Sequence, residues 1–236
     1  MDMIAAPDAS AGSAADLNTS NASSLVARLG GIGGMLFVVS VIVQNAVRAG
    51  YPRADASAAK VVAYYAVHHS GALALAAMLP FGLLGLGAFV GAMMARAAHG
   101  KGRGSAFAGL FGAAGIMGTF LMVSATDFAI DAYVGRGDPD LSVVSGMWVL
   151  HNAVFGVLLG AIGVALAGLT IACAESGVLH ARWRVAGLLG GLALLVAAGT
   201  TPAIVDGGPT MFVGLAGFVV WVVFLVAASI RLLHGR

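Results

Sequence analysis

The chain has 236 residues, of which 60% are hydrophobic and only 9% are charged, and its mean hydropathy is +0.97. A water-soluble domain of this size needs a mostly polar surface. The composition therefore excludes a water-soluble domain and indicates an integral membrane protein. The net charge of +2 comes without a basic, aromatic-rich patch, which excludes a nucleic-acid partner. The single cysteine excludes a disulfide within the chain.

The first predicted domain, residues 1–27, is a disordered cytoplasmic tail. It contains Asp2, Asp8 and Asp16, no Lys or Arg, and many Ala, Ser and Asn residues. Such a composition is typical of disorder, because it offers little apolar surface to bury. The segment also lacks the basic leader and apolar core of a secretory signal.

The second predicted domain, residues 28–236, is a bundle of six transmembrane helices. A helix needs roughly 20 apolar residues to cross a bilayer, whereas a strand of a β-barrel needs about half as many. Six apolar runs have the helical length: 29–47, 71–95, 106–125, 148–174, 185–205 and 211–233. The predicted fold class is therefore all-α.

The positions of the basic residues predict the orientation. With six spans, the N-terminal flank, the second and fourth loops and the C-terminus share one side of the membrane. That side holds eight of the twelve Lys and Arg residues. The positive-inside rule makes it cytoplasmic, together with both termini. The expected location is a cell membrane, namely a bacterial plasma membrane.

The first outer loop contains a predicted interfacial helix. Val61, Tyr64, Tyr65 and His68 recur at helical spacing, and tyrosines suit the headgroup level of a bilayer. This helix leads directly through His69 into the second span.

Three segments resemble a known group of proteins. They are Ala27–Gly30 at the start of the first span, Val61–Tyr65 before the paired histidines, and Ser176–Leu179 leading to Arg182 and Trp183. In these segments the chain resembles uncharacterised six-helix membrane proteins common in actinobacteria. The resemblance covers most of the chain after the tail. It implies the six-span topology and assigns no catalytic residue.

Polar residues gather at the predicted outer ends of the spans. A charged side chain in the middle of a bilayer costs about 2.5 to 3.5 kcal/mol, so these groups are expected to turn inward. We expect them to form a polar pocket open to the extracytoplasmic side. The candidate ligand-binding residues are Asn45, His68, His69, Asp127, Asp131, His151, Asn152 and Asp206.

The favoured prediction is a non-enzymatic protein that binds a small molecule, a lipid or a partner subunit through this pocket. The first alternative is a membrane-embedded hydrolase in which Asp127, His151 and one of His68 or His69, with His68 as the first candidate, hold a divalent metal such as zinc. Asp131 or Asp206 would then act as the general base. The second is a small cation- or proton-coupled transporter that uses the same acids. A purely structural role, in which Asp127, Asp131 and His151 form a cap that holds three helices in register, stays open. Small residues on the spans also suit a homo-oligomer or a membrane partner.

Overall fold

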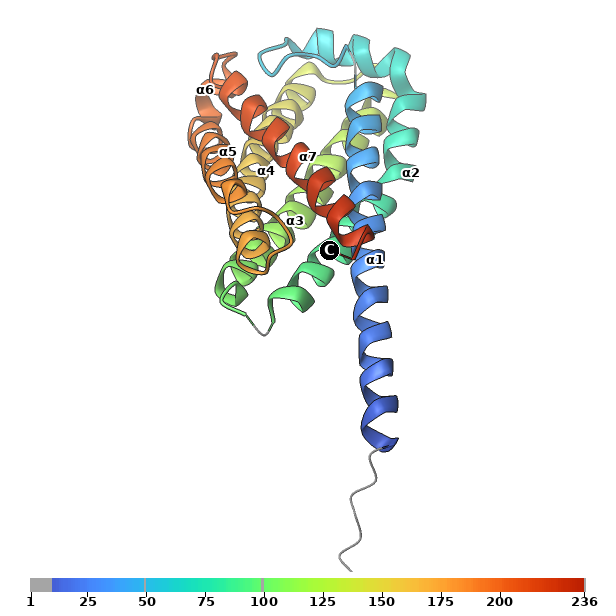
Figure 1. Ribbon diagram of the computed structural model, residues 1–236. Helices are drawn as coiled ribbons and strands as arrows, with labels where there is room; N and C mark the ends of the chain where they lie inside the picture. Colours follow the sequence, from blue (N-terminus) through green and yellow to red (C-terminus); the bar gives the residue numbers. More distant parts are fainter. Residues whose placement is uncertain (1–9, 49, 99, 236) are drawn as a thin grey trace, which may run out of the picture.

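The computed structural model describes residues 10–48, 50–98 and 100–235 (Figure 1). Within these ranges the regular structure is entirely helical. The helices are α1 (Ser10–Val47), α2 (Ala58–Ala97), α3 (Arg103–Val134), α4 (Leu141–Glu175), α5 (Arg182–Gly199), α6 (Thr201–Val205) and α7 (Met211–Leu233). The predicted all-α class is confirmed.

Six of these helices are long and apolar enough to cross a membrane, as predicted. The chain therefore has the build of a multi-pass membrane protein. Several boundaries differ from the prediction, and α4 begins at Leu141 instead of residue 148. Helix α3 continues to Val134 instead of ending near residue 125, and the fifth span ends at Gly199. Pro202 then starts the short helix α6, because proline fits the first turn of a helix better than its interior.

Helix α1 begins at Ser10, within the segment that we predicted to be a disordered tail. Residues 10–27 are helical in the structure, whereas the cytoplasmic location of the tail and the division into two domains stay predictions. Alanine has the highest helix propensity, and the Ala residues between positions 11 and 22 allow the helix of the first span to extend backward. Residues 1–9 lie outside the described residues.

Helix α2 bends at His68, whose φ of −109° and ψ of 24° are not helical. The part before the bend is the helix predicted in the first outer loop. Figure 1 shows it lying across one end of the bundle, which we call the upper end. There Val61 and Tyr65 are buried against Ile130 of α3 and Trp148 of α4. This layer covers the predicted outer ends of α3 and α4.

The six long helices form a closed ring. Along the ring, α1 packs against α2, α2 against α3, α3 against α4, α4 against α5, α5 against α7, and α7 against α1. Helix α4 also contacts α2 and α7 across the ring and is the most buried span. It is therefore the central element of the bundle.

Helix α7 crosses the bundle diagonally. Its C-terminal half lies against α1, whereas its start lies beside α5 and α6 (Figure 1). The lower contact is tight because Gly31 and Gly34 of α1 face Ser229 and Leu233. Helices α1 and α7 therefore diverge toward the upper end of the bundle.

Candidate functional site

Asp127 lies at the centre of a buried polar cluster at the upper end, although it sits on a helix that is apolar on most sides. Its carboxylate is 2% exposed. One oxygen accepts a charged hydrogen bond from Arg48 at 2.6 Å. The other accepts hydrogen bonds from the hydroxyls of Tyr51 and Tyr65, the latter at 2.6 Å. A buried carboxylate needs such partners, and here they come from α1, the following loop, and α2.

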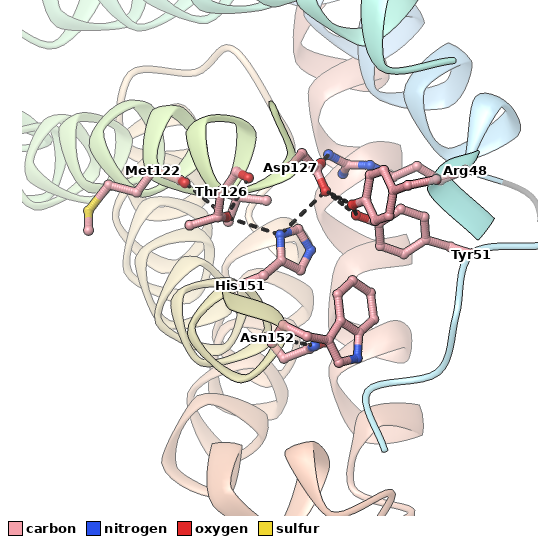
Figure 2. Close-up of polar contacts among 10 residues, drawn as sticks. Arg48, Tyr51, Met122, Thr126, Asp127, His151 and Asn152 are labelled. Carbon is pink, nitrogen blue, oxygen red and sulfur yellow. Dashed lines mark hydrogen bonds and ion pairs between the residues drawn. The ribbon is translucent and has the colours of Figure 1, made fainter. Parts of the chain in front are cut away.

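His151 of α4 completes the cluster on its other side (Figure 2). Its Nδ1 lies 3.1 Å from the Thr126 hydroxyl and 3.5 Å from Asp127. The Thr126 hydroxyl is within donating distance of two backbone carbonyls of α3. With its proton engaged there, the hydroxyl accepts from His151, which places the imidazole proton on Nδ1.

Aromatic rings seal the cluster. The His151 and Trp148 rings are stacked, 5.2 Å apart and 3° from parallel, and Tyr51 lies against both. Trp148 also donates a hydrogen bond from its indole nitrogen to the Ala54 carbonyl at 3.0 Å. These contacts attach the loop before α2 to the start of α4.

The two tyrosines are held in their neutral form. Burial, followed by the nearby Asp127 carboxylate, raises the pKa of Tyr51 and of Tyr65 above the ordinary value of 10.0. Both effects disfavour a phenolate, because it would add a second negative charge to a buried site. Arg48 and Asp127 thus balance each other while the hydroxyls remain donors.

An alkaline titration tests this arrangement. The unfolded chain releases tyrosine protons near pH 10.0 while folded Tyr51 and Tyr65 retain theirs, so their contribution to stability is complete below that pH and declines above it. We expect native wild type and a Tyr51→Phe/Tyr65→Phe variant to show the same rise in tyrosinate absorbance near pH 10. Loss of half of the rise in the variant, which removes two of the four tyrosines, would contradict this expectation.

Asp131, one helical turn further along α3, makes a separate contact. It accepts a hydrogen bond from Nδ1 of His69 at 2.7 Å. The imidazole is 66% exposed, whereas Asp131 is buried and its other carboxylate oxygen has no hydrogen-bond partner among the described residues. The pair ties α2 to α3 just after the bend at His68.

The other predicted site residues do not join the cluster. His68 stacks on Tyr64 and bonds to its carbonyl oxygen. Asn45 and Asn152 each donate to a carbonyl one turn earlier in their own helices. Asp206 is exposed at the end of α6. The structure therefore brings together Asp127 and His151, pairs Asp131 with His69 separately, and leaves the other four predicted residues outside both contacts.

The metal-site hypothesis gains no support from this geometry. Among the described residues, no three His, Cys, Asp or Glu side chains converge as a metal site requires. Asp127 and His151 are close, but Arg48 and two tyrosine hydroxyls already occupy the carboxylate. Of the two candidates for the third ligand, His68 is engaged with Tyr64 and His69 with Asp131.

A cavity of about 220 Å³ lies beside the cluster, inside the ring, between α1, α3, α4 and α7. Its walls are mostly apolar, with Phe37 and Trp221 among them, and its polar lining includes Gln44 and Asn45 on α1 and Arg48 directly after α1. The apolar lining also includes Val41, Ile116, Phe120, Phe155, Leu158, Leu159, Ile162, Met211, Phe212, Leu215 and Phe218. The mostly apolar lining of this cavity differs from the polar pocket that we predicted.

Arg48 belongs to both features and was not among the predicted site residues. It follows the first span in the sequence and resembles an ordinary boundary charge. Its role depends on Asp127, 79 positions later, which no local pattern reveals. Gln44 carried a stronger signal, since an amide inside an apolar run calls for a partner.

No protein-family model, curated protein or solved structure matches the chain. The function is therefore inferred from this geometry alone.

Proposed function

We propose that this multi-pass membrane protein binds an amphiphilic small molecule or lipid in the cavity between α1, α3, α4 and α7. The apolar part of the ligand lies among the aromatic and aliphatic side chains, and its polar head lies near Gln44 and Arg48. The upper end of the bundle is the one predicted to face the extracytoplasmic side. The ligand then enters from the outer half of the bilayer.

The volume and lining of the cavity support an apolar ligand. Dry apolar cavities of roughly 150 Å³ already accept molecules such as benzene, and this one is larger. Its lining on α1 extends from Phe37 to Arg48, which is roughly 16 Å at the rise of an α-helix. A hydrocarbon chain inserted along α1 fits this shape.

The arrangement of α7 supports entry from the side. The start of α7 borders the cavity, because Met211, Phe212 and Leu215 belong to its lining together with residues of α1. Phe212 and Leu215, which line the cavity, are 67% and 55% exposed. In a membrane, side chains in this position contact lipid, so a lipid chain can pass from the bilayer to the cavity without meeting water.

The observation that carries the proposal is Gln44. Its side chain lines the cavity and is only 4% exposed, and among the described residues it makes no hydrogen bond. Two further polar atoms of the lining, Nε of Arg48 and Nε1 of Trp221, are buried without a hydrogen-bond partner among the described residues. Polar groups left without a partner in an apolar site cost free energy, and nearly all buried ones in proteins are satisfied. Polar atoms of a ligand satisfy these groups.

Fluorescence quenching tests the proposal. Trp221 lines the cavity and is 1% exposed, so bulk lipid does not reach it. We expect a single-chain amphiphile brominated near its tail to quench the protein in detergent micelles in a saturable way. Trp221→Phe should remove most of this quenching, whereas Trp183→Phe, outside the cavity lining, should retain it.

The control separates cavity binding from quenching by the surrounding micelle. Micelle quenching rises without saturation and follows the exposure of each tryptophan. If quenching is not saturable, or if Trp221→Phe retains it in full, the proposal is wrong.

A further inference from the structure

The head end of the cavity combines an unpartnered amide with a charge that is already neutralised. Gln44 presents a donor and an acceptor near the end of α1, four residues before Arg48, which directly follows the helix and also lines the cavity. These two residues define which head group the site accepts.

Among the described residues that line the cavity, Arg48 is the only charged one. Its terminal nitrogen is paired with Asp127 at 2.6 Å, so the two charges cancel. Its Nε–H is buried and has no hydrogen-bond partner within the described residues. The site therefore has spare hydrogen-bonding capacity but no spare charge.

Electrostatics then separates the ligand classes. An anionic head would bring a second negative charge close to Asp127, with one guanidinium to balance both. A cationic head would face Arg48 with no free carboxylate. Either would be buried uncompensated in an apolar site, which is far more costly than burying a neutral group that is hydrogen-bonded.

We infer that the ligand is an amphiphile with an uncharged, oxygen-bearing head, such as a glycerol ester, whose carbonyl and hydroxyl oxygens bond to Gln44 and Arg48. This inference rests on the proposed function, since it assigns the ligand class of the same cavity. Asp127 acts here as a positioning residue, because it holds and neutralises Arg48 without touching the ligand.

Three tail-matched brominated probes test the inference: a monoacylglycerol, a fatty acid at a pH where it is ionised, and an alkyl trimethylammonium. Saturable quenching of Trp221 measures the affinity of each. We expect the monoacylglycerol to bind most tightly. Gln44→Leu should weaken its binding about threefold to tenfold, as expected for the loss of one hydrogen bond, and leave the other probes little changed.

Ser40→Ala is the matched control, because Ser40 lies one turn before Gln44 on α1 and is outside the cavity lining, and its buried hydroxyl has no partner among the described residues. It should bind the monoacylglycerol like wild type. Equal affinity for all three probes, with no effect of Gln44→Leu, overturns the head assignment and leaves cavity binding intact. Tightest binding of the fatty acid or of the ammonium probe also overturns it. Absence of saturable quenching by any probe overturns the proposed function itself.

Discussion

Replacing Asp127 by Asn should destabilise the folded protein by about 3–5 kcal/mol, which is a large part of the stability of a typical domain. The change keeps the shape of the side chain and an acceptor oxygen for Tyr51 and Tyr65. It removes the charge that balances Arg48, which is 17% exposed and loses its ion-pair partner. Unfolding by a denaturing detergent in mixed micelles, followed by circular dichroism, measures the loss.

Asp131→Asn is the matched control, since it is the same change one turn further along the same helix. Asp131 is itself buried, but its partner His69 is 66% exposed and screened by solvent, so this pair contributes less than the more deeply buried pair of Asp127 and Arg48. We expect a smaller loss than that of Asp127→Asn. Equal losses in the two variants would show that burial of the Asp127 cluster is not what stabilises the upper end.

A double variant distinguishes an unbalanced charge from a general disturbance of packing. Arg48→Met removes the guanidinium and keeps an apolar side chain of similar length. Combined with Asp127→Asn, it should recover most of the stability that Asp127→Asn alone loses, because no unpaired charge remains in the buried site. A double variant that is less stable than both single variants would contradict this account.

The span pattern was predictable because membrane insertion depends on local sequence. Every backbone group in a bilayer must be bonded within its own segment, so length and hydropathy alone mark the six helices. The bend at His68 and the end of the fifth span before Thr200 were harder to predict. They depend on how the flanking segments pack at the upper end, which local hydropathy does not encode.

The polar cluster was predictable only in part, for a similar reason. Asp127 and His151 stood out because charged or titratable groups are costly inside apolar segments. The partners of Asp127 did not, since Arg48 and Tyr51 flank the first span and resemble ordinary boundary residues. The sequence also gave no sign that His68 turns toward Tyr64, because one residue with non-helical dihedrals decides its direction.

The spacing of glycines likewise predicted only part of the helix packing. Gly30 and Gly34 are four residues apart, a spacing that allows close helix approach, and both lie tightly against neighbouring helices. Gly87 and Gly91 have the same spacing but face open space. Spacing identifies a small-residue face, whereas the rotation of the helix in the bundle decides whether that face meets a partner.

The closest approach of α3 and α4 leads to the last prediction. A Cβ added at Gly112 of α3 would meet backbone atoms of Ala165, and one added at Gly168 of α4 would meet backbone atoms of Gly109. Backbone cannot move aside as a flexible side chain can, so the two helices must separate. We expect Gly112→Ala and Gly168→Ala each to lower the free energy of unfolding by about 1–3 kcal/mol, the usual cost of overpacking.

Gly118 and Gly146 provide the controls, because they lie on the same two helices and an added Cβ would meet nothing within 4 Å. In a helix, Ala is favoured over Gly by roughly 0.5–1 kcal/mol, so Gly118→Ala and Gly146→Ala should be neutral or stabilising. The two pairs of variants thus carry the same chemical change and should shift stability in opposite directions. Since α3 carries Asp127 and α4 carries His151, separation of the helices should also weaken the cluster at the upper end. Gly112→Ala with unchanged stability would mean that the α3–α4 contact is looser than the structure indicates.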